Sequence, residues 1–363
     1  MDKKGSDADQ HESTGTSRGL RRTLFGCKSW APVIPVFVLM LIGVAVCDVV
    51  MEANILSHAS EAIQQDTSYS CKPRVVNAST IESSLGHRFY TMLKESAVPA
   101  PTFRGNHSWL CKEEWRSQMK FGYCLPISGR KDTPFCTAAD RMDLLNSHPT
   151  YNSTCYASVL HMLLVEVYEE LKAAGNTPLI TFGSLLGAVR NGSMIPFTED
   201  TDIGFVGELK ARYELQEALK QKGYHMFFFD IWRVCVAPTH PLAGRLYDPS
   251  LPITKKFSVP YVDLYKMTKL YNGKWNVEEL EGSDGRLLPG DVVEPFSQVT
   301  INGMPFDTVH DPNFFLTEAY GKDYMTPKPR EDPRVPAAFA SKQKLLEVIQ
   351  RMKEKNARVP WGN

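Results

Sequence analysis

The chain lacks an excess of charge of either sign, because its 41 Lys and Arg residues balance 41 Asp and Glu residues over 363 positions. Proteins that bind polyanions usually carry a basic excess, so the composition does not support nucleic acid as a partner. No internal repeat occurs. Apolar residues at 43% and charged residues at 23% are ordinary values for a globular protein.

Lysine and arginine are absent between Lys28 and Lys72. Within this stretch, residues 30–50 form an apolar run, WAPVIPVFVLMLIGVAVCDVV, in which Asp48 is the single charge. A helix of this length spans roughly 31 Å, enough to cross a bilayer core of about 30 Å. Basic residues precede the run, and the positive-inside rule therefore predicts a cytosolic N-terminus and a lumenal C-terminal part. We expect a transmembrane signal anchor after a disordered cytosolic tail over residues 1–29.

A cleaved signal peptide is the main alternative to this anchor, and a buried core helix is a further one. The apolar run exceeds the ~7–15 residues usual in a signal peptide, and the polar segment before it is long. The expected topology is a single-pass type II membrane protein of the Golgi or endoplasmic reticulum. The absence of a C-terminal retrieval signal favours the Golgi.

No Cys-x-x-Cys pair occurs among the eight cysteines, which disfavours a zinc site. Six cysteines follow the apolar run, an even number that allows three disulfides in 15 possible connectivities. These are Cys71, Cys111, Cys124, Cys136, Cys155 and Cys235. Four glycosylation sequons begin on the same side, at Asn77, Asn106, Asn152 and Asn191. Both features favour the secretory pathway, although Asn191-Gly192 is also typical of an unmodified tight turn.

Residues 51–150 show no clean periodicity and are expected to form an irregular, disulfide-tied lumenal stem. Their large aromatic residues require burial. These are Phe103, Trp109, Trp115, Phe121 and Tyr123. A catalytic domain is expected over residues 151–335, followed by a C-terminal helix and tail over 336–363.

Strands and helices intermix after residue 151. Helical spacing predicts helices over 156–172 and 208–223 and a third between the Asp311-Pro312 cap and Gly321. Strands are predicted over 178–182, 200–206, 224–230, WRVCVAP and 260–267. Asn272-Gly273 and Asn302-Gly303 are each typical of a two-residue hairpin turn. The pattern predicts an α/β or α+β fold.

Asp200 and Asp202 alternate in the strand DTDIGFV, so both side chains are expected on one face, about 7 Å apart. Two carboxylates so placed repel one another unless a cation lies between them. Mg²⁺ or Mn²⁺ accepts such oxygen ligands and keeps positions open for phosphate oxygens. The pair alone is a weak signal, since a solvated strand edge has the same pattern.

Gly183-Ser184 follows a predicted strand and begins a predicted helix, a position at which backbone amides can bind phosphate. A simple helix cap gives the same pattern. Arg190 lies two turns further along, where it could reach the phosphate or pair with a surface acid. Asp263 stands among apolar residues in VPYVDLYKM, and burying it unpaired would be costly. It is a candidate for a third metal ligand or for the base that takes a proton from an acceptor hydroxyl.

The segment FGSLLGAVRNGSMIPFTEDTDIGF resembles the signature of the LicD/fukutin-related family. The later YVDLY and PFDTVHDPNFFLTEAYGKDYMTPKP resemble further elements of that family, over roughly residues 155–330. The resemblance implies a nucleotidyltransferase-like mixed sheet flanked by helices. It also implies metal-dependent transfer of a phospho-alcohol group, such as phosphocholine or ribitol phosphate, from a CDP-linked donor to a glycan.

Carried over by position, the resemblance makes Asp200, Asp202 and Asp263 the metal ligands and catalytic residues, and Gly183, Ser184 and Arg190 the phosphate-binding group. Phe197 replaces the family's tryptophan and Thr198 the first residue of its acidic run, which puts a second metal in doubt. Two other functions remain open from the residues alone. One is a type II sugar-nucleotide glycosyltransferase, and the other is a catalytically silent anchored scaffold.

Overall fold

The computed structural model describes Met40 and residues 69–81, 88–96, 98–132, 135–146, 153–255, 258–280 and 286–327. The chain divides into two compact units, Met1–Gln65 and Asp66–Asn363. The predicted anchor, apart from Met40, and both predicted tails lie outside the described residues. No helix in the described part of the chain is long and apolar enough to cross a bilayer.

A mixed eight-stranded sheet organises the second unit. Its strands run in the order β5-β6-β7-β4-β3-β10-β9, and β8 pairs with β7. The β4–β7 and β3–β10 pairs are parallel and the remaining pairs are antiparallel. The strands are β3 (Pro178–Ile180), β4 (Asp200–Val206), β5 (Tyr224–Phe229), β6 (Ile231–Val236), β7 (Tyr261–Lys269), β8 (Trp275–Val277), β9 (Ser297–Ile301) and β10 (Met304–Thr308). The predicted mixed α/β architecture is confirmed.

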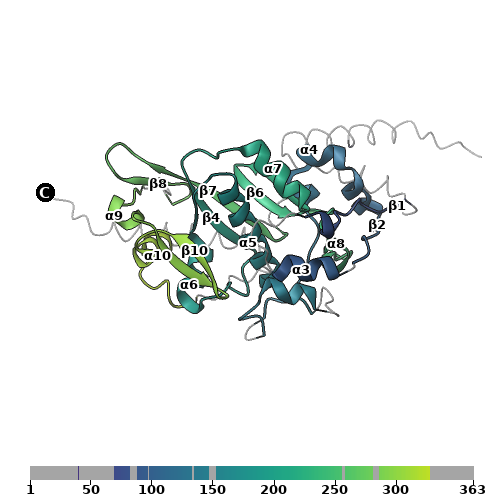
Figure 1. Ribbon diagram of the computed structural model, residues 1–363, viewed down its shortest axis with the longest axis horizontal. Helices are drawn as coiled ribbons and strands as arrows, with labels where there is room; N and C mark the ends of the chain where they lie inside the picture. The colour runs from purple at the N-terminus through teal and green to yellow at the C-terminus, as the bar shows by residue number, and fades with distance from the viewer. Residues whose placement is uncertain are drawn as a thin grey trace, which may run out of the picture. The chain divides into compact units, whose positions relative to one another are not determined.

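Helices flank the sheet (Figure 1). The longest, α5, contacts β3, β4, β6 and β7 and is buried over most of its length, while α7 packs against α5 and β5. At the far end of the chain, α10 packs on α6 and α9. The helices are α3 (Arg88–Glu95), α4 (Arg116–Met119), α5 (Tyr156–Ala173), α6 (Phe182–Asn191), α7 (Arg212–Gln221), α8 (Ala243–Leu246), α9 (Gly290–Val293) and α10 (Pro312–Tyr320).

Local signals in the sequence place several boundaries correctly. Strand β4 matches its predicted range, and α10 begins after Asp311, whose side chain accepts a hydrogen bond from the Phe314 amide at 3.0 Å. The helix predicted from residue 208 begins later, at Arg212. Gly207 and Ala211 have φ values of 75° and 46°, and such left-handed backbone cannot continue a right-handed helix.

The two predicted hairpin turns differ. Ile301 pairs directly with Met304, and Asn302 and Gly303 both have positive φ, as a two-residue type I′ turn requires. The β7–β8 hairpin is wider than predicted. Its Leu270 amide donates to the Lys274 carbonyl at 2.8 Å, which leaves three residues in the loop rather than two.

The segment predicted as a stem contributes to the same unit as the sheet. Three disulfides form, as expected from the even number of cysteines: Cys71–Cys111, Cys124–Cys235 and Cys136–Cys155. The second joins residue 124 to β6, and one hydrophobic core includes Phe89 and Leu110 together with Ile203 of β4. The segment contains two short strands and several 3₁₀ turns: β1 (Ser70–Cys71), β2 (Phe103–Arg104), η1 (Ala78–Thr80), η2 (Gly105–Cys111), η3 (Glu113–Trp115), η4 (Lys120–Tyr123) and η5 (Arg141–Leu145).

The aromatic residues of this segment divide into two groups. Phe103, Phe121 and Tyr123 are buried, as predicted. Trp109 and Trp115 are 47% and 44% exposed and lie edge to face with ring centres 6.2 Å apart. The expectation of burial was wrong for these two tryptophans, because they cover one another and not the core.

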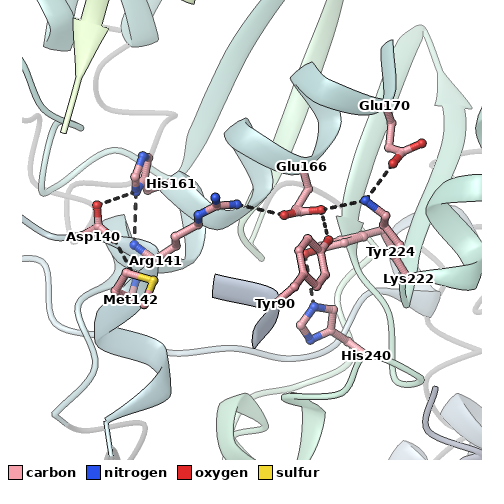
Figure 2. Close-up of polar contacts among 10 residues, drawn as sticks. All are labelled: Tyr90, Asp140, Arg141, Met142, His161, Glu166, Glu170, Lys222, Tyr224 and His240. Carbon is pink, nitrogen blue, oxygen red and sulfur yellow. Dashed lines mark hydrogen bonds and ion pairs between the residues drawn. The ribbon is translucent and has the colours of Figure 1, made fainter. Parts of the chain in front are cut away.

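A buried ionic network ties the segment to α5 (Figure 2). The carboxylate of Glu166 is fully buried and accepts hydrogen bonds from Tyr90 on α3, from Arg141 on η5 at 2.9 Å, and from Lys222 at 3.3 Å. Lys222 also forms an ion pair with Glu170 at 2.7 Å. Two cations and a phenol therefore surround one buried anion and connect four separate stretches of chain.

Candidate active site

Three aspartates converge on the two central parallel strands. Asp200 and Asp202 lie on β4, and Asp263 lies on β7 as the register partner of Asp202. Each offers one carboxylate oxygen to a cluster in which these oxygens lie within 4.8 Å of one another. The predicted common face for Asp200 and Asp202 is confirmed, and the structure brings Asp263 to the same place.

The start of α6 holds the carboxylate of Asp202. The Ser184 amide donates to Asp202 Oδ2 at 3.2 Å, and the Asp202 amide donates to Ser184 Oγ at 2.7 Å. Ser184 Oγ also shares a hydrogen bond of 2.6 Å with the Thr201 hydroxyl. The sequence-based expectation that this amide is free for phosphate is therefore wrong. The Ser184 amide positions the central aspartate instead.

Gly183 is required by the same close approach. A Cβ atom at this position would lie 2.9 Å from Asp202 Oδ2, closer than side chains normally tolerate. The carboxylate can rest on the helix start only because position 183 has no side chain. Gly183 also lines the pocket described below.

Asp263 is buried but paired, which offsets part of the cost of its burial. The Arg233 guanidinium on β6 forms an ion pair with Asp263 Oδ1 at 2.7 Å, and the two residues are register partners across the strands. The Tyr265 hydroxyl donates to Asp263 Oδ2 at 3.2 Å and lies 3.3 Å from Asp202 Oδ1. Arg233 and Tyr265 were missed at the level of sequence. A charged residue inside the apolar run IWRVCV was the available signal.

Asp200 is the most accessible of the three. It lies at the first position of β4 and is half-buried, whereas Asp202 and Asp263 are 6% and 5% exposed. The Thr198 hydroxyl donates to Asp200 Oδ1 at 2.9 Å, and the Tyr261 hydroxyl to Oδ2 at 3.3 Å. Thr198, which replaces an acid of the family pattern, thus orients a cluster carboxylate.

The cluster is electrostatically strained in the absence of a cation. Burial raises the pKa of Asp202 well above its usual value, and the neighbouring Asp200 and Asp263 raise it further. Burial also raises the pKa of Asp263, to about 7, although the Arg233 charge opposes this shift. Desolvation and like charge both disfavour the ionised acids, so a cation bound between them would relieve both penalties.

A pocket of about 630 Å³ opens onto this cluster. Its walls are aromatic and acidic, and none of the described residues that line it is basic. Asp263 does not line the pocket, so it belongs to the cluster without facing the pocket itself. The lining includes Phe182, Phe197, Tyr261, Tyr265 and Tyr320 together with Glu199, Asp200, Asp202 and Glu279. Every charged side chain among these described lining residues is acidic, so a diphosphate entering the pocket would need a cation to bind.

Arg190 does not belong to this pocket. It lies on α6 as predicted, but its guanidinium donates to the carbonyl oxygen of Tyr324, from Nε at 3.0 Å, and to that of Thr326 at 3.4 Å. Among the described residues, its partners are these backbone carbonyls and not the predicted surface acid. Arg190 instead holds the segment that follows α10.

Residues 175–308 match the family model described as LicD/FKTN/FKRP, nucleotidyltransferase domain. This match supports the resemblance of the segment to the LicD/fukutin-related family. The match contains all three clustered aspartates and the start of α6, and it is shorter than the range over which the motifs resemble the family. LicD-type domains are phosphotransferase-like, so the matched domain supports a transferase. The comparison with curated proteins found no match for this chain.

Proposed function

We propose that this protein transfers a phospho-alcohol group, of the phosphocholine or ribitol phosphate kind, from a CDP-linked donor to a glycan. The observation that carries the proposal is the cluster of three carboxylates at a pocket whose described lining contains no basic residue. Enzymes that move phosphoryl groups must neutralise the charge of the diphosphate. Here the protein supplies anionic ligands, and a divalent cation would supply the positive charge.

The donor set fits Mg²⁺ or Mn²⁺. All three candidate ligands are carboxylate oxygens, which such hard cations prefer. The raised pKa values of Asp202 and Asp263 mean that their ionised forms are disfavoured unless a cation lies nearby. Asp200 and Asp202 would hold the ion at the pocket, and Asp263 would complete the set from behind. When bound, the cation polarises the phosphate and stabilises charge on the leaving nucleotide.

The residues of the chain would position the reactants. The acceptor hydroxyl oxygen bonds to the donor phosphorus, the phosphoanhydride bond breaks, and CMP leaves with its electron pair. The hydroxyl proton passes to a carboxylate of the pocket. Of the two roles considered for Asp263, its burial and its ion pair with Arg233 favour metal binding over proton transfer. The aromatic walls offer stacking surfaces for a nucleobase and exclude water.

The compartment proposed is the lumen of the Golgi or endoplasmic reticulum, with the chain anchored as a type II membrane protein through residues 30–50. The disulfides support an oxidising environment. The sequons at Asn77 and Asn106 lie at exposed residues, accessible to glycosylation there.

The test is nucleotide release from CDP-linked and sugar-linked donors with and without Mn²⁺. Asp202→Asn should lower CMP release by roughly 100-fold or more, because it removes a metal ligand while keeping the side-chain shape. The exposed Asp291 on α9 provides the matched control, and Asp291→Asn should have no effect. Release of UDP or GDP with a glycosidic product would instead indicate a glycosyltransferase, and no metal-dependent nucleotide binding would indicate a silent scaffold.

A further inference from the structure

A second cavity lies at the free edge of the sheet, along β5, which is the terminal strand. Its volume is about 670 Å³. It is bounded by α7 and the β5–β6 hairpin, and by η3 and α4 of the segment predicted as a stem. The lining residues are Glu113, Glu114, Arg116, Ser117, Tyr213, Gln216, Glu217, Lys220, His225, Met226, Phe227, Phe228 and Trp232. None of them belongs to the aspartate pocket.

One wall of this cavity is aromatic and faces solvent. Tyr213 is 72% exposed and Phe228 is 52% exposed. Phe228 lies edge to face with Trp232, with ring centres 5.3 Å apart. Arg212 lies over Tyr213 at 4.5 Å and over Trp232 at 5.6 Å, which holds the rings in place. Large aromatic side chains fixed at the surface of a cavity are typical of ligand sites and not of solvated faces.

Other lining residues are polar and include a buried cation. Arg116 is 9% exposed. Its Nε donates to His225 Nδ1 at 3.2 Å and its Nη2 to the Tyr224 carbonyl. Its Nη1 has no hydrogen-bond partner among the described residues. This nitrogen is itself buried, so the guanidinium contributes positive charge to the cavity wall and not an open hydrogen-bond donor.

The edge of the sheet disfavours an added peptide strand. Strand addition requires outward-facing backbone groups on β5. The Tyr224 carbonyl is occupied by Arg116, and the Met226 carbonyl accepts a hydrogen bond from the Gln216 side chain at 3.3 Å. Two of the acceptors of β5 are therefore taken by side chains of the cavity wall, which disfavours an extended peptide as the occupant.

We propose that this cavity is a binding subsite for a neutral saccharide. Sugar rings present an apolar face that packs on aromatic rings, and hydroxyl groups that both donate and accept hydrogen bonds. The lining offers both partners, with three glutamates as acceptors and Lys220 and Ser117 as donors. The glutamate excess disfavours an anionic sugar. That this saccharide is part of the acceptor glycan rests on the proposed function, whereas its binding does not.

The test is saccharide binding to the disulfide-bonded protein, without metal or nucleotide. The probes are lactose, chitobiose, mannobiose and the charged sialyllactose, followed by saturation-transfer NMR and titration. We expect a neutral probe to bind, and Tyr213→Ala and Phe228→Ala each to weaken it about tenfold. Tyr271, a fully exposed aromatic residue at the β7–β8 turn, is the matched control, and Tyr271→Ala should leave binding unchanged.

Unaltered melting temperatures would show that the two variants remain folded, as their exposure predicts. No binding by any probe, preference for sialyllactose, or equal affinity in Tyr213→Ala would overturn the proposal. Asp202→Asn should bind saccharide normally. If the native protein binds a saccharide but shows no transfer, the proposed function is contradicted and the subsite is not. If it shows transfer but binds no saccharide, the subsite is contradicted and the proposed function is not.

Discussion

At the scale of single residues, the cluster of acids is shaped by neighbours that hold each carboxylate differently. The Asp202 carboxylate accepts a hydrogen bond from the Ser184 amide, and the Asp200 carboxylate accepts one from the Thr198 hydroxyl. The Asp263 carboxylate forms an ion pair with the Arg233 guanidinium. These contacts orient the oxygens before any ion arrives. Preorganised ligands of this kind lose little entropy when a metal binds.

Protons should compete with the metal at this cluster. Because the folded pKa of Asp263 is raised to about 7 and that of Asp202 is also raised, the folded protein binds more protons than the unfolded chain above the usual carboxyl pKa of 3.8. The metal-free protein should therefore lose stability as pH rises from about 4 to 7. Added Mn²⁺ should raise the melting temperature much more at pH 8 than at pH 5.5, as measured by calorimetry. Equal shifts at both pH values would contradict this prediction.

At the scale of elements, α5 is the axis around which the unit is packed. It contacts four strands of the sheet and carries Glu166, which meets Tyr90 of α3 and Arg141 of η5. The helix therefore joins the core of the sheet to the segment predicted as a stem (Figure 2). Buried charges are tolerated there because each has an opposite charge in contact.

Glu166→Gln should destabilise the fold by about 3–5 kcal/mol, because Arg141 and Lys222 would keep their buried charges without the central anion. Denaturant unfolding measures this loss as a lower midpoint at unchanged slope. The exposed Glu214 on α7 is the control, and Glu214→Gln should change stability by less than about 0.5 kcal/mol. A similar small effect at Glu166 would mean that the network contributes no net stability.

At the scale of the whole molecule, covalent links join parts that are distant in sequence. The Cys124–Cys235 bridge closes 111 residues and the Cys71–Cys111 bridge closes 40. In the chain-entropy account, the stabilisation by a disulfide grows with the logarithm of the loop it closes. The bridge to β6 therefore restricts the unfolded chain most.

Replacing Cys124 and Cys235 together by serine should lower the free energy of unfolding by roughly 2–5 kcal/mol. The matched double replacement of Cys71 and Cys111 should cost about 0.9 kcal/mol less, from the ratio of the two loop lengths. Calorimetry of both double variants provides the comparison. The reverse order would show that strain or packing outweighs loop entropy.

Local features were predictable from sequence because short-range rules determine them. The alternation of Asp200 and Asp202 follows from strand geometry, the Asn302-Gly303 turn from positive φ, and the start of α10 from an aspartate cap followed by proline. Each depends on residues within a few positions of one another. The motifs around them were enough to indicate the LicD family.

Contacts between distant residues were decided only by the tertiary structure. The pairing of Arg233 with Asp263, the use of the Ser184 amide by Asp202, and the choice among cysteine pairings all depend on which strands and loops become neighbours. Strand order and register are set by burial summed over the whole core, which no local pattern encodes. The three clustered aspartates could therefore be named from sequence, whereas the residues that pair with them and orient them could not.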